Sequence, residues 1–165
     1  MAFNEIVVIS GKGGTGKTTV TASLIPYFEN IVIGDCDVDA PNLKILFAKN
    51  DIENKEFFGM KKAKRNLKLC KNCNKCFEYC KFNAIDNPTK CEGCGVCKIV
   101  CPYNAIEMID NKAGDLFISN TDFGKIVHAC LIPGEENSGK LVAEVRRTTK
   151  QIAEKENINT IILDG

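Results

Sequence analysis

The chain has 165 residues, of which 44% are hydrophobic, and a formal net charge of +1. This length fits one ordinary domain with or without a small insert, and the near-neutral charge gives no global attraction to nucleic acid or to an anionic membrane. No segment approaches the ~20 apolar residues of a membrane span, and the N-terminus lacks the features of a signal peptide. We therefore expect a cytoplasmic protein without a nucleic-acid partner, whose ten cysteines stay reduced and bind metal.

The first element is a short β-branched run, IVVIS at residues 6–10, which is typical of a buried parallel strand. The next stretch, SGKGGTGKTT, matches the complete G-x-x-x-x-G-K-[ST] pattern through Gly11, Gly16, Lys17 and Thr18. In such a loop backbone N–H groups and the following helix N-terminus surround the β-phosphate, the lysine bridges the β- and γ-phosphates, and the threonine ligates Mg²⁺. We expect the nucleotide to be held by Gly11, Lys12, Gly13, Gly14, Thr15, Gly16, Lys17, Thr18 and Thr19.

A helix is expected from Lys17 onward, with Val20, Leu24 and Phe28 on one face and a kink at Pro26, which deletes a helix hydrogen bond. Residues 31–37, IVIGDCD, form a second buried strand that ends in aspartates. An aspartate at such a strand end, facing the loop, holds Mg²⁺ through water or orients an attacking water. The alternative is that these aspartates, Asp35, Asp37 and Asp39 together with Asp164 further along the chain, are solvated turn carboxylates, and this alternative is strongest for Asp39.

The C-terminal third returns to alternating strands and helices. Residues 116–120 and 125–132 are expected to form a hairpin, Ser138 to cap a helix, and residues 160–165 to form a third buried strand that ends at Asp164. His128, Cys36 and Cys130 fall in expected strands and are interpreted as structural residues, the cysteines as small buried groups. Strand and helix alternation implies an α/β fold, a doubly wound parallel sheet with ligands at the carboxyl ends of its strands.

The middle of the chain is cysteine-rich and contains an internal repeat. CKNCNKCFEYCKFNAI at residues 70–85 and CEGCGVCKIVCPYNAI at residues 91–106 are offset by 21 residues, and each carries C-x₂-C-x₂-C-x₃-C. This is the run of bacterial two-cluster ferredoxins, in which the fourth cysteine ligates the other cluster. The expected ligands are Cys70, Cys73, Cys76 and Cys101 for one [4Fe–4S] cluster, and Cys91, Cys94, Cys97 and Cys80 for the other.

Two features of this region leave alternatives open. Structural zinc would use two C-x₂-C pairs per site and would leave the third cysteine of each run unexplained. The first run also departs from the pattern at Lys81, where the second run has Pro102.

A basic stretch precedes the runs, KKAKRNLK at residues 61–68, which we interpret as a solvated linker, with a docking surface for an acidic redox partner as the alternative. The chain thus divides into an N-terminal P-loop part (1–59), an inserted small α+β ferredoxin-like domain (60–112) and the continuation of the P-loop domain (113–165).

GKGGTGKTT followed by DCDVDAPNL resembles the deviant Walker A ATPases, the superfamily of MinD, ParA, the Mrp-type iron–sulfur carriers and the nitrogenase iron protein. The resemblance implies ATP as the nucleotide and a homodimer in which Lys12 reaches the partner's phosphates. It further implies that Asp37 activates water, that Asp35 and Asn42 are neighbouring switch residues, and that Asp164 is the Walker B aspartate that acts with Thr18 at Mg²⁺. Lys12, Lys17 and Asp37 are then the catalytic residues.

The whole arrangement, with HACLIPGEENSGKLVAEVR at residues 128–146, resembles a narrower group of MinD-superfamily ATPases with an inserted ferredoxin domain. In that superfamily the Walker B strand continues into further strands, so we expect this chain to be a fragment that lacks a third to a half of the ATPase domain. The expected function is an Mg-ATP-dependent ATPase that couples hydrolysis to electron transfer through two [4Fe–4S] clusters and serves an unidentified redox or iron–sulfur client protein. Alternatives are an iron–sulfur carrier or assembly scaffold and a positioning ATPase.

Overall fold

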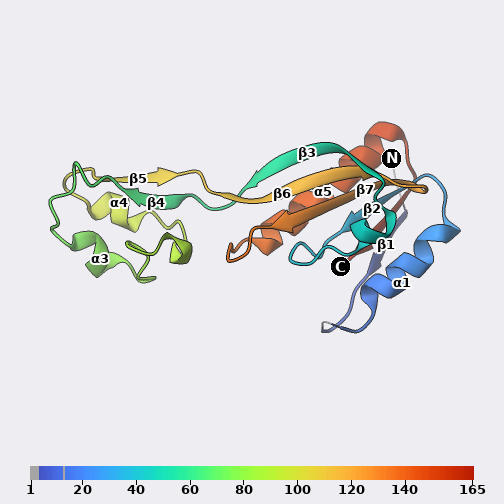
Figure 1. The fold of residues 1–165 in the computed structure, drawn as a ribbon, viewed down its shortest axis with the longest axis horizontal. Coiled ribbons are helices and arrows are strands. Elements are labelled where there is room, and N and C mark those ends of the chain that lie inside the picture. The colour runs from blue at the N-terminus through green and yellow to red at the C-terminus, as the bar shows by residue number, and fades with distance from the viewer. Residues whose placement is uncertain (1–3, 13) are drawn as a thin grey trace. The chain divides into compact units, whose positions relative to one another are not determined.

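A computed structural model describes residues 4–12 and 14–165, and these residues form two compact units (Figure 1). The first unit contains the described residues up to Phe57, together with Gly114–Pro133 and Asn137–Gly165. The second unit contains Phe58–Ala113 and the short segment Gly134–Glu136. That this last segment belongs with the second unit was not indicated by the sequence.

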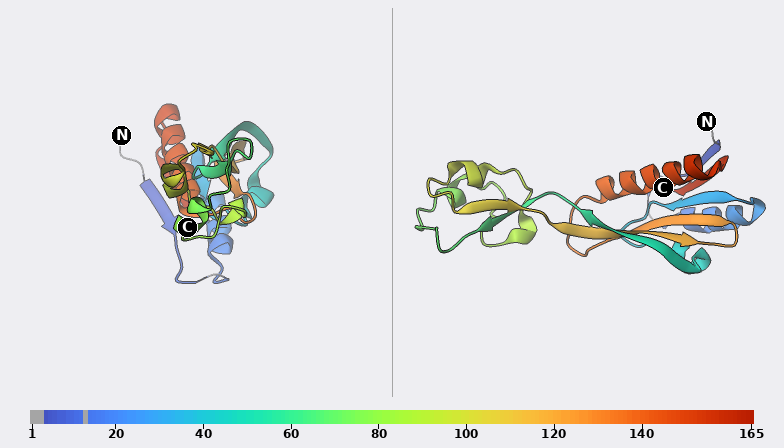
Figure 2. Two further views of the ribbon diagram at one scale, coloured as in Figure 1. Left: turned by 90° about the vertical axis from the view of Figure 1, so that its left-hand side faces the viewer. Right: turned by 90° about the horizontal axis from the view of Figure 1, so that it is seen from above.

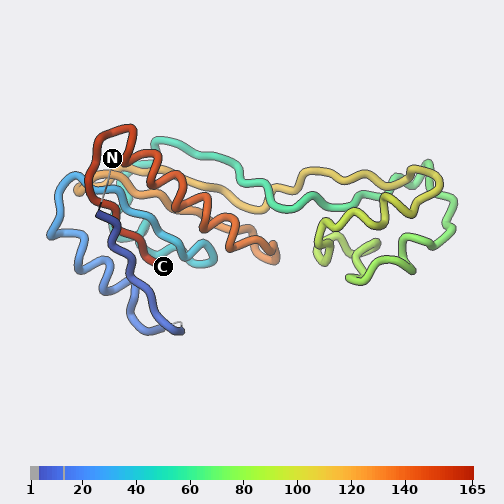
Figure 3. Tube along the Cα trace, turned by 180° about the vertical axis from the view of Figure 1, so that it is seen from behind, coloured from blue at the N-terminus to red at the C-terminus, as the bar shows by residue number. Residues whose placement is uncertain are grey.

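A six-stranded sheet forms the centre of the first unit, in the order β1-β8-β2-β7-β6-β3. Pairs β1–β8, β8–β2 and β2–β7 are parallel, and β6–β7 is antiparallel. The N-terminal and C-terminal strands therefore lie side by side, as the trace in Figure 3 shows. The elements of this unit are the strands β1 (Asn4–Val8), β2 (Ile31–Asp35), β3 (Asn50–Phe58), β6 (Lys112–Asn120), β7 (Gly124–Leu131) and β8 (Thr160–Asp164), and the helices α1 (Lys17–Leu24), α2 (Leu43–Phe47) and α5 (Ser138–Glu156), with a 3₁₀ helix at Ile25–Tyr27.

Helices cover both faces of this sheet. Alternate residues of a strand point to opposite faces, so each buried strand packs against helices on both sides. On β2, Ile31 and Ile33 pack in one hydrophobic core with Ile25, Leu43 and Ile162, on the side of α1 and α2. Gly34 faces α5 instead, and a Cβ there would stand 3.0 Å from Thr149 Oγ1 and 2.5 Å from Leu163 Cδ2. The absence of a side chain at Gly34 lets α5 pack directly on β2. Helix α1 lies on the opposite side of the sheet (Figure 2, right).

The expected α/β class, with a mainly parallel central sheet, is thus confirmed. The hairpin is also confirmed as β6–β7. The helix from Lys17 ends at Leu24, and Pro26 lies in the 3₁₀ turn that follows it. Val20 is 57% exposed and does not face the core, which is instead met by Thr21 and Ile25.

Two local expectations are wrong. Ser138 does not cap α5: it is the first helical residue, and the N-cap is Asn137, whose left-handed backbone (φ 96°) makes no side-chain capping bond. Cys130 is exposed rather than buried, although most residues of β7, its neighbours Ala129 and Leu131 included, are buried. Cys36 lies just after β2 and is partly buried.

The second unit has a two-stranded antiparallel sheet, β4 (Lys62–Arg65) with β5 (Ile106–Ile109). Two short helices, α3 (Lys75–Tyr79) and α4 (Val96–Val100), pack together, and a 3₁₀ turn at Pro88–Lys90 links them. The basic stretch is therefore not a simple linker, since part of it forms β4. No helix of the described residues has both the length and the apolar character that a bilayer span requires.

Candidate functional site

The phosphate-binding loop joins β1 to α1 and has the backbone that its glycines permit. Gly14 and Gly16 have φ of 74° and 86°, a left-handed conformation that residues with a Cβ rarely adopt. Gly16 is the N-cap of α1, so the helix N-terminus points its free N–H groups into the loop. Gly13 lies outside the described residues.

One cleft of about 350 Å³ joins the loop to the segment after β2. A cleft of this size is at the lower end of the range for small-molecule sites. Asp37 and Asn42, which lie far from the loop in the sequence, both reach this cleft. Its lining residues are Gly14, Thr15, Gly16, Lys17, Thr18, Thr19, Asp37 and Asn42.

Three strand ends meet beneath this cleft, since Asp164 is the register partner of both Val8 and Asp35. Asp164 is 2% exposed and accepts a 2.6 Å hydrogen bond from the Thr18 hydroxyl. The hydroxyl of Thr21 lies 3.0 Å from the other carboxylate oxygen. A threonine hydroxyl and a carboxylate held this close, next to a phosphate-binding loop, are a suitable pair of groups for Mg²⁺.

Asp35 shapes the segment that carries Asp37 and Asn42. Its carboxylate accepts hydrogen bonds from the backbone N–H of Asp37 (3.2 Å) and of Leu43 (3.1 Å). Burial raises the pKa of Asp35 to about 6, although these two bonds oppose the rise. Asp37 is exposed and accepts a 3.0 Å bond from the N–H of Ala40, so its carboxylate is held in a tight turn at the cleft.

Lys12 does not line the cleft with the other described loop residues, and Gly11 does not either. The hydroxyls of Ser10 and Thr15 donate to the carbonyl oxygen of Lys12, at 2.9 and 3.2 Å, and thereby fix the backbone at this position. Its side chain is exposed. Asp39 is also exposed and is not part of the cleft lining.

In the second unit the two cysteine runs adopt the same backbone conformation. Left-handed residues recur at the 21-residue offset, as Asn72 and Gly93 (φ 53° and 66°), Asn74 and Gly95 (59° and 75°), and Asn83 and Asn104 (50° and 49°). The fourth cysteines also match, with φ and ψ of −83° and 101° at Cys80 and −78° and 107° at Cys101. Cys80 is followed by Lys81 and Cys101 by Pro102, yet the backbone conformations of the two cysteines are nearly the same.

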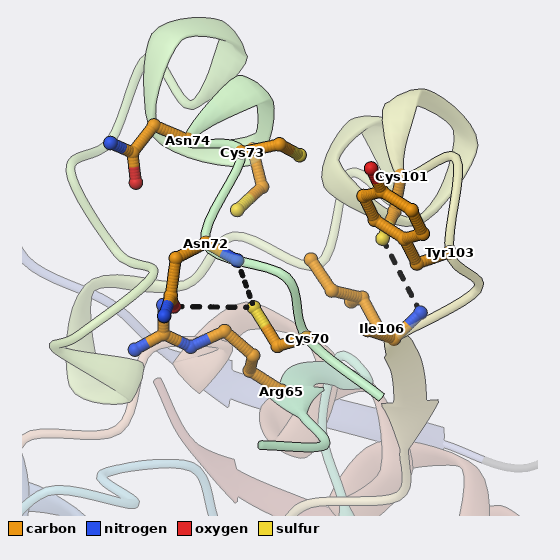
Figure 4. Close-up of a pocket in the computed structure, with 10 residues that line it drawn as sticks. Arg65, Cys70, Asn72, Cys73, Asn74, Cys101, Tyr103 and Ile106 are labelled. Atoms are coloured by element: carbon orange, nitrogen blue, oxygen red, sulfur yellow. Dashed lines mark hydrogen bonds between the residues drawn. The ribbon is translucent and has the colours of Figure 1, made fainter. Parts of the chain in front are cut away.

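The structure brings cysteines of the two runs close to one another. One pocket is lined by Cys70, Cys73 and Cys76 of the first run and by Cys101 of the second (Figure 4). Burial raises the pKa of the Cys97 thiol, and its cysteine neighbours Cys91, Cys94 and Cys80 raise it further, against the backbone N–H of Lys98. The last of these neighbours, Cys80, comes from the first run.

Backbone N–H groups donate hydrogen bonds to the first and fourth cysteine sulfurs of each run. Ala84 and Ala105 donate to Cys80 and Cys101 at 3.4 and 3.3 Å, so the two fourth cysteines are equivalent here too. The first cysteines differ: Cys70 accepts from Asn72 of its own run, at 3.4 Å, whereas Cys91 accepts from Ala63 of β4, at 3.4 Å. Such N–H···S bonds stabilise thiolate sulfur and tune the potential of a bound iron–sulfur cluster.

Among the described residues, no group of three or more histidine, cysteine or carboxylate side chains is placed so that it could hold a metal ion. A single zinc ion draws all its sulfur ligands to about 2.3 Å from one centre. A [4Fe–4S] cube instead takes each thiolate on a different iron atom, so its ligands stand around a cavity. Each of the two expected ligand sets has one buried cysteine, Cys76 or Cys97.

Two residues of these sites were not predicted from the sequence. Thr21 touches Asp164, and the available signal was a hydroxyl one helical turn after Lys17, on the face that meets the sheet. Arg65 lines the first cysteine pocket, and no local pattern marks it, because β4 brings it there from outside the runs.

Comparison with known proteins gives one family and two relatives. Residues 6–163 match the CobQ/CobB/MinD/ParA nucleotide binding domain. The uncharacterized protein MJ0578 of Methanocaldococcus jannaschii is 38% identical over 156 residues, which cover 89% of this chain and 55% of that protein. The uncharacterized protein MJ0579 of the same organism is 48% identical over 50 residues, 28% of this chain and 19% of its own length.

The chain thus spans about half the length of MJ0578, the longer of the two matches. No solved structure matches the chain. The family match covers the phosphate-binding loop, the whole of β2 with its last residue Asp35, and nearly all of β8. Together with the mainly parallel sheet and the cleft at the loop, it shows that the chain belongs to the CobQ/CobB/MinD/ParA family of nucleotide-binding domains.

Proposed function

We propose that this chain is part of an Mg-ATP-dependent ATPase that carries two [4Fe–4S] clusters and couples ATP binding and hydrolysis to electron transfer. The observation that supports the proposal is that Cys101 of the second run lines one pocket together with three cysteines of the first run. Cys80 of the first run is in turn among the cysteine neighbours of Cys97. A nucleotide-binding family domain in the same chain supplies the other half of the proposal.

At the nucleotide site each side chain has a distinct task. Lys17 bridges the β- and γ-phosphates, and Thr18 with Asp164 holds Mg²⁺, for which their 2.6 Å contact is well placed. Asp37 orients the water that attacks the γ-phosphorus as the bond to the β–γ bridging oxygen breaks. Asp35 is a positioning residue, because it holds the backbone at Asp37 and at Leu43, the residue after Asn42.

Lys12 serves the nucleotide of a second copy of the chain. It is exposed, it does not line its own cleft, and its backbone is fixed by two hydroxyl groups. A cation presented in this way, beside a loop that already has Lys17, is available to the phosphates of a partner subunit.

In the second unit, Cys70, Cys73, Cys76 and Cys101 hold one cluster and Cys91, Cys94, Cys97 and Cys80 hold the other. A [4Fe–4S] cluster supplies one-electron oxidation and reduction when it is bound. The protein's part is to supply thiolates, to screen the cluster from water through buried residues such as Ile106, and to stabilise sulfur charge with backbone N–H groups.

The chain connects the two sites through short segments. After the turn held by Asp35, only α2 separates Asn42 from β3, and β3 leads into the second unit. A second connection runs through Glu135, which within the second unit accepts from Lys62 at 2.7 Å and from Asn111 at 2.7 Å. The chain continues from there into α5, which precedes Asp164 (Figure 3). Segments that sense the γ-phosphate commonly change order with nucleotide state, so both connections can transmit it.

An iron–sulfur carrier is the second candidate function, and the exposure of Cys73 and Cys94 favours it. An exposed ligand in each set gives a client protein access to the cluster. The complete eight-cysteine spacing and the buried ligands Cys76 and Cys97 favour permanent redox clusters instead.

The test is anaerobic purification of the intact protein, followed by iron and sulfide analysis, spectroscopy and ATP hydrolysis assays. Two [4Fe–4S] clusters per chain and Mg²⁺-dependent hydrolysis are expected. Cys80→Ala should lose a cluster, whereas the matched control Cys130→Ala, outside both runs, should retain both. Clusters that pass to an apo-ferredoxin on incubation would favour the carrier, and zinc in place of iron would refute the proposal.

A further inference from the structure

We infer that Arg65 makes the two clusters unequal, so that the cluster held by Cys70, Cys73, Cys76 and Cys101 has the higher reduction potential and receives the first electron. The inference rests on the proposed function, because it needs both clusters. It concerns where an electron resides within the second unit, which neither the family nor the cysteine spacing specifies.

The position of Arg65 is well defined. It lies at the end of β4, opposite Ile106 in the β4–β5 register, and its side chain is only 22% exposed. The guanidinium carbon lies 5.3 Å from the centre of the Phe77 ring, and Nη2 donates to Asp86 at 2.9 Å. These contacts hold a permanent positive charge in place.

That charge faces one cysteine pocket. Arg65 lines the pocket of the first set, where Figure 4 shows it beside Asn72 and Cys70, with Cys101 on the other side. Phe77, on which it lies, directly follows the buried ligand Cys76. Arg65 therefore stands next to the ligands of the first set.

The second set has a different environment at the equivalent places. The counterpart of Phe77 at the 21-residue offset is Lys98, whose side chain is exposed to solvent. The first cysteine, Cys91, receives its hydrogen bond from the backbone of Ala63 instead of from its own run.

The effect of the charge has a definite sign. Reduction adds one negative charge to a group that is already anionic with its four thiolates, so a fixed cation nearby favours the reduced state. A charge within about 4–6 Å shifts an ionisation equilibrium by one to three decades. Because Asp86 offsets part of the charge of Arg65, we expect about a tenfold effect on the reduction equilibrium, which is about 59 mV for one electron.

The experiment is an anaerobic redox titration of the intact protein, followed by electron paramagnetic resonance, after iron and sulfide analysis of each variant. The parent should show two potentials. Arg65→Gln should lower the higher potential by about 59 mV, which is a tenfold change in the reduction equilibrium, and should leave the lower potential in place. Arg65→Lys should largely retain both potentials. Lys98→Gln is the matched control, since it removes an exposed cation beside the other set and should leave the higher potential unchanged.

Asp86→Asn separates a charge effect from a structural one. Both Arg65→Gln and Asp86→Asn break the same ion pair, but the charge effect predicts that Asp86→Asn raises the higher potential. Two clusters with equal potentials, or shifts of both variants in the same direction, would overturn the inference and leave the proposed function standing. Absence of clusters from the parent would overturn the proposed function itself. Where Arg65→Gln assembles only one cluster, the direction of the Asp86→Asn shift decides.

Discussion

Burial of Asp35 makes the stability of the first unit depend on pH, and the structure sets the size of the effect. Asp35 is 1% exposed. Desolvation raises its pKa from 3.8 to about 6, the bonds from Asp37 and Leu43 oppose this rise, and the negative charges of Asp164 and Asp37 add to it. A difference of about two pKa units corresponds to about 3 kcal/mol at 1.36 kcal/mol per unit.

The sign follows from proton linkage. The folded state binds the Asp35 proton more tightly than the unfolded chain, so this contribution to stability is fully present below pH 3.8. It falls as the pH rises through the interval between 3.8 and about 6, and it is lost above that interval. Asp35→Asn cannot ionise and should therefore lose this part of the pH dependence.

The substitution also has a constant cost, because an amide has one acceptor oxygen for the two N–H donors that Asp35 satisfies. One lost hydrogen bond costs about 1 kcal/mol at every pH. Asp35→Asn should thus be about 1 kcal/mol less stable than the parent near pH 3.5 and about 2 kcal/mol more stable near pH 8.

The assay is urea-dependent hydrogen exchange of the β2 and α5 amides, which reports on the first unit alone, in the parent and the variant across this pH range. Asp39→Asn is the control, since Asp39 is exposed and should leave the stability curve of the parent unchanged. Parallel curves for the parent and Asp35→Asn would refute the reasoning, because burial would then not penalise the ionised form of Asp35.

Three further predictions concern the individual sites. Cys101→Ala should destroy the cluster that the first run holds, because its fourth ligand crosses from the second run; iron analysis and spectroscopy would decide, and loss of the other cluster instead would contradict the crossed assignment. Lys17→Ala should abolish tight Mg-ATP binding, whereas Lys12→Ala should keep binding but lose ATP-dependent dimerisation and hydrolysis. Nucleotide titration beside sedimentation of the intact protein tests this pair, and normal dimers of Lys12→Ala would exclude a role across the interface. Asp37→Ala should retain ATP binding and lose turnover, since an orienting group acts mainly in the transition state; hydrolysis at the parental rate would assign the role elsewhere.

The sequence predicted those parts of the molecule that depend on local pattern. Short-range sequence patterns mark the phosphate-binding loop and two β-branched strands, Ile31–Asp35 and Thr160–Asp164. The bounds predicted from these patterns agree with the structure to within two residues. The strand Asn50–Phe58 was missed because it has no apolar alternation: it is one of the two edge strands, nearly every side chain on it is exposed, and pairing with β6 holds it. The other edge strand is β1, which the sequence predicted as a strand but wrongly as a buried one, since Val7 is 43% exposed. An edge strand of this kind has no signature in hydrophobic periodicity.

Residues whose role depends on long-range contact were likewise missed. Arg65 is brought to the cysteine pocket by the pairing of β4 with β5, and Glu135 is bonded to Lys62 and Asn111, which are distant in the sequence. The cap of α5 was assigned to Ser138 because serine is a favoured capping residue. The preceding segment Gly134–Glu136 belongs to the second unit, so the chain turns into α5 through a left-handed Asn137 instead.

The central claim is that nucleotide and clusters are coupled, and an anaerobic redox titration of the intact protein with and without a non-hydrolysable ATP analogue tests it most directly. A coupling of about 1–3 kcal/mol is typical of linked sites. At about 59 mV per tenfold change for one electron, it corresponds to a shift of roughly 40–130 mV. We predict such a shift in at least one cluster potential, with the corresponding change in analogue affinity on reduction. Identical potentials with and without the analogue would contradict the coupling.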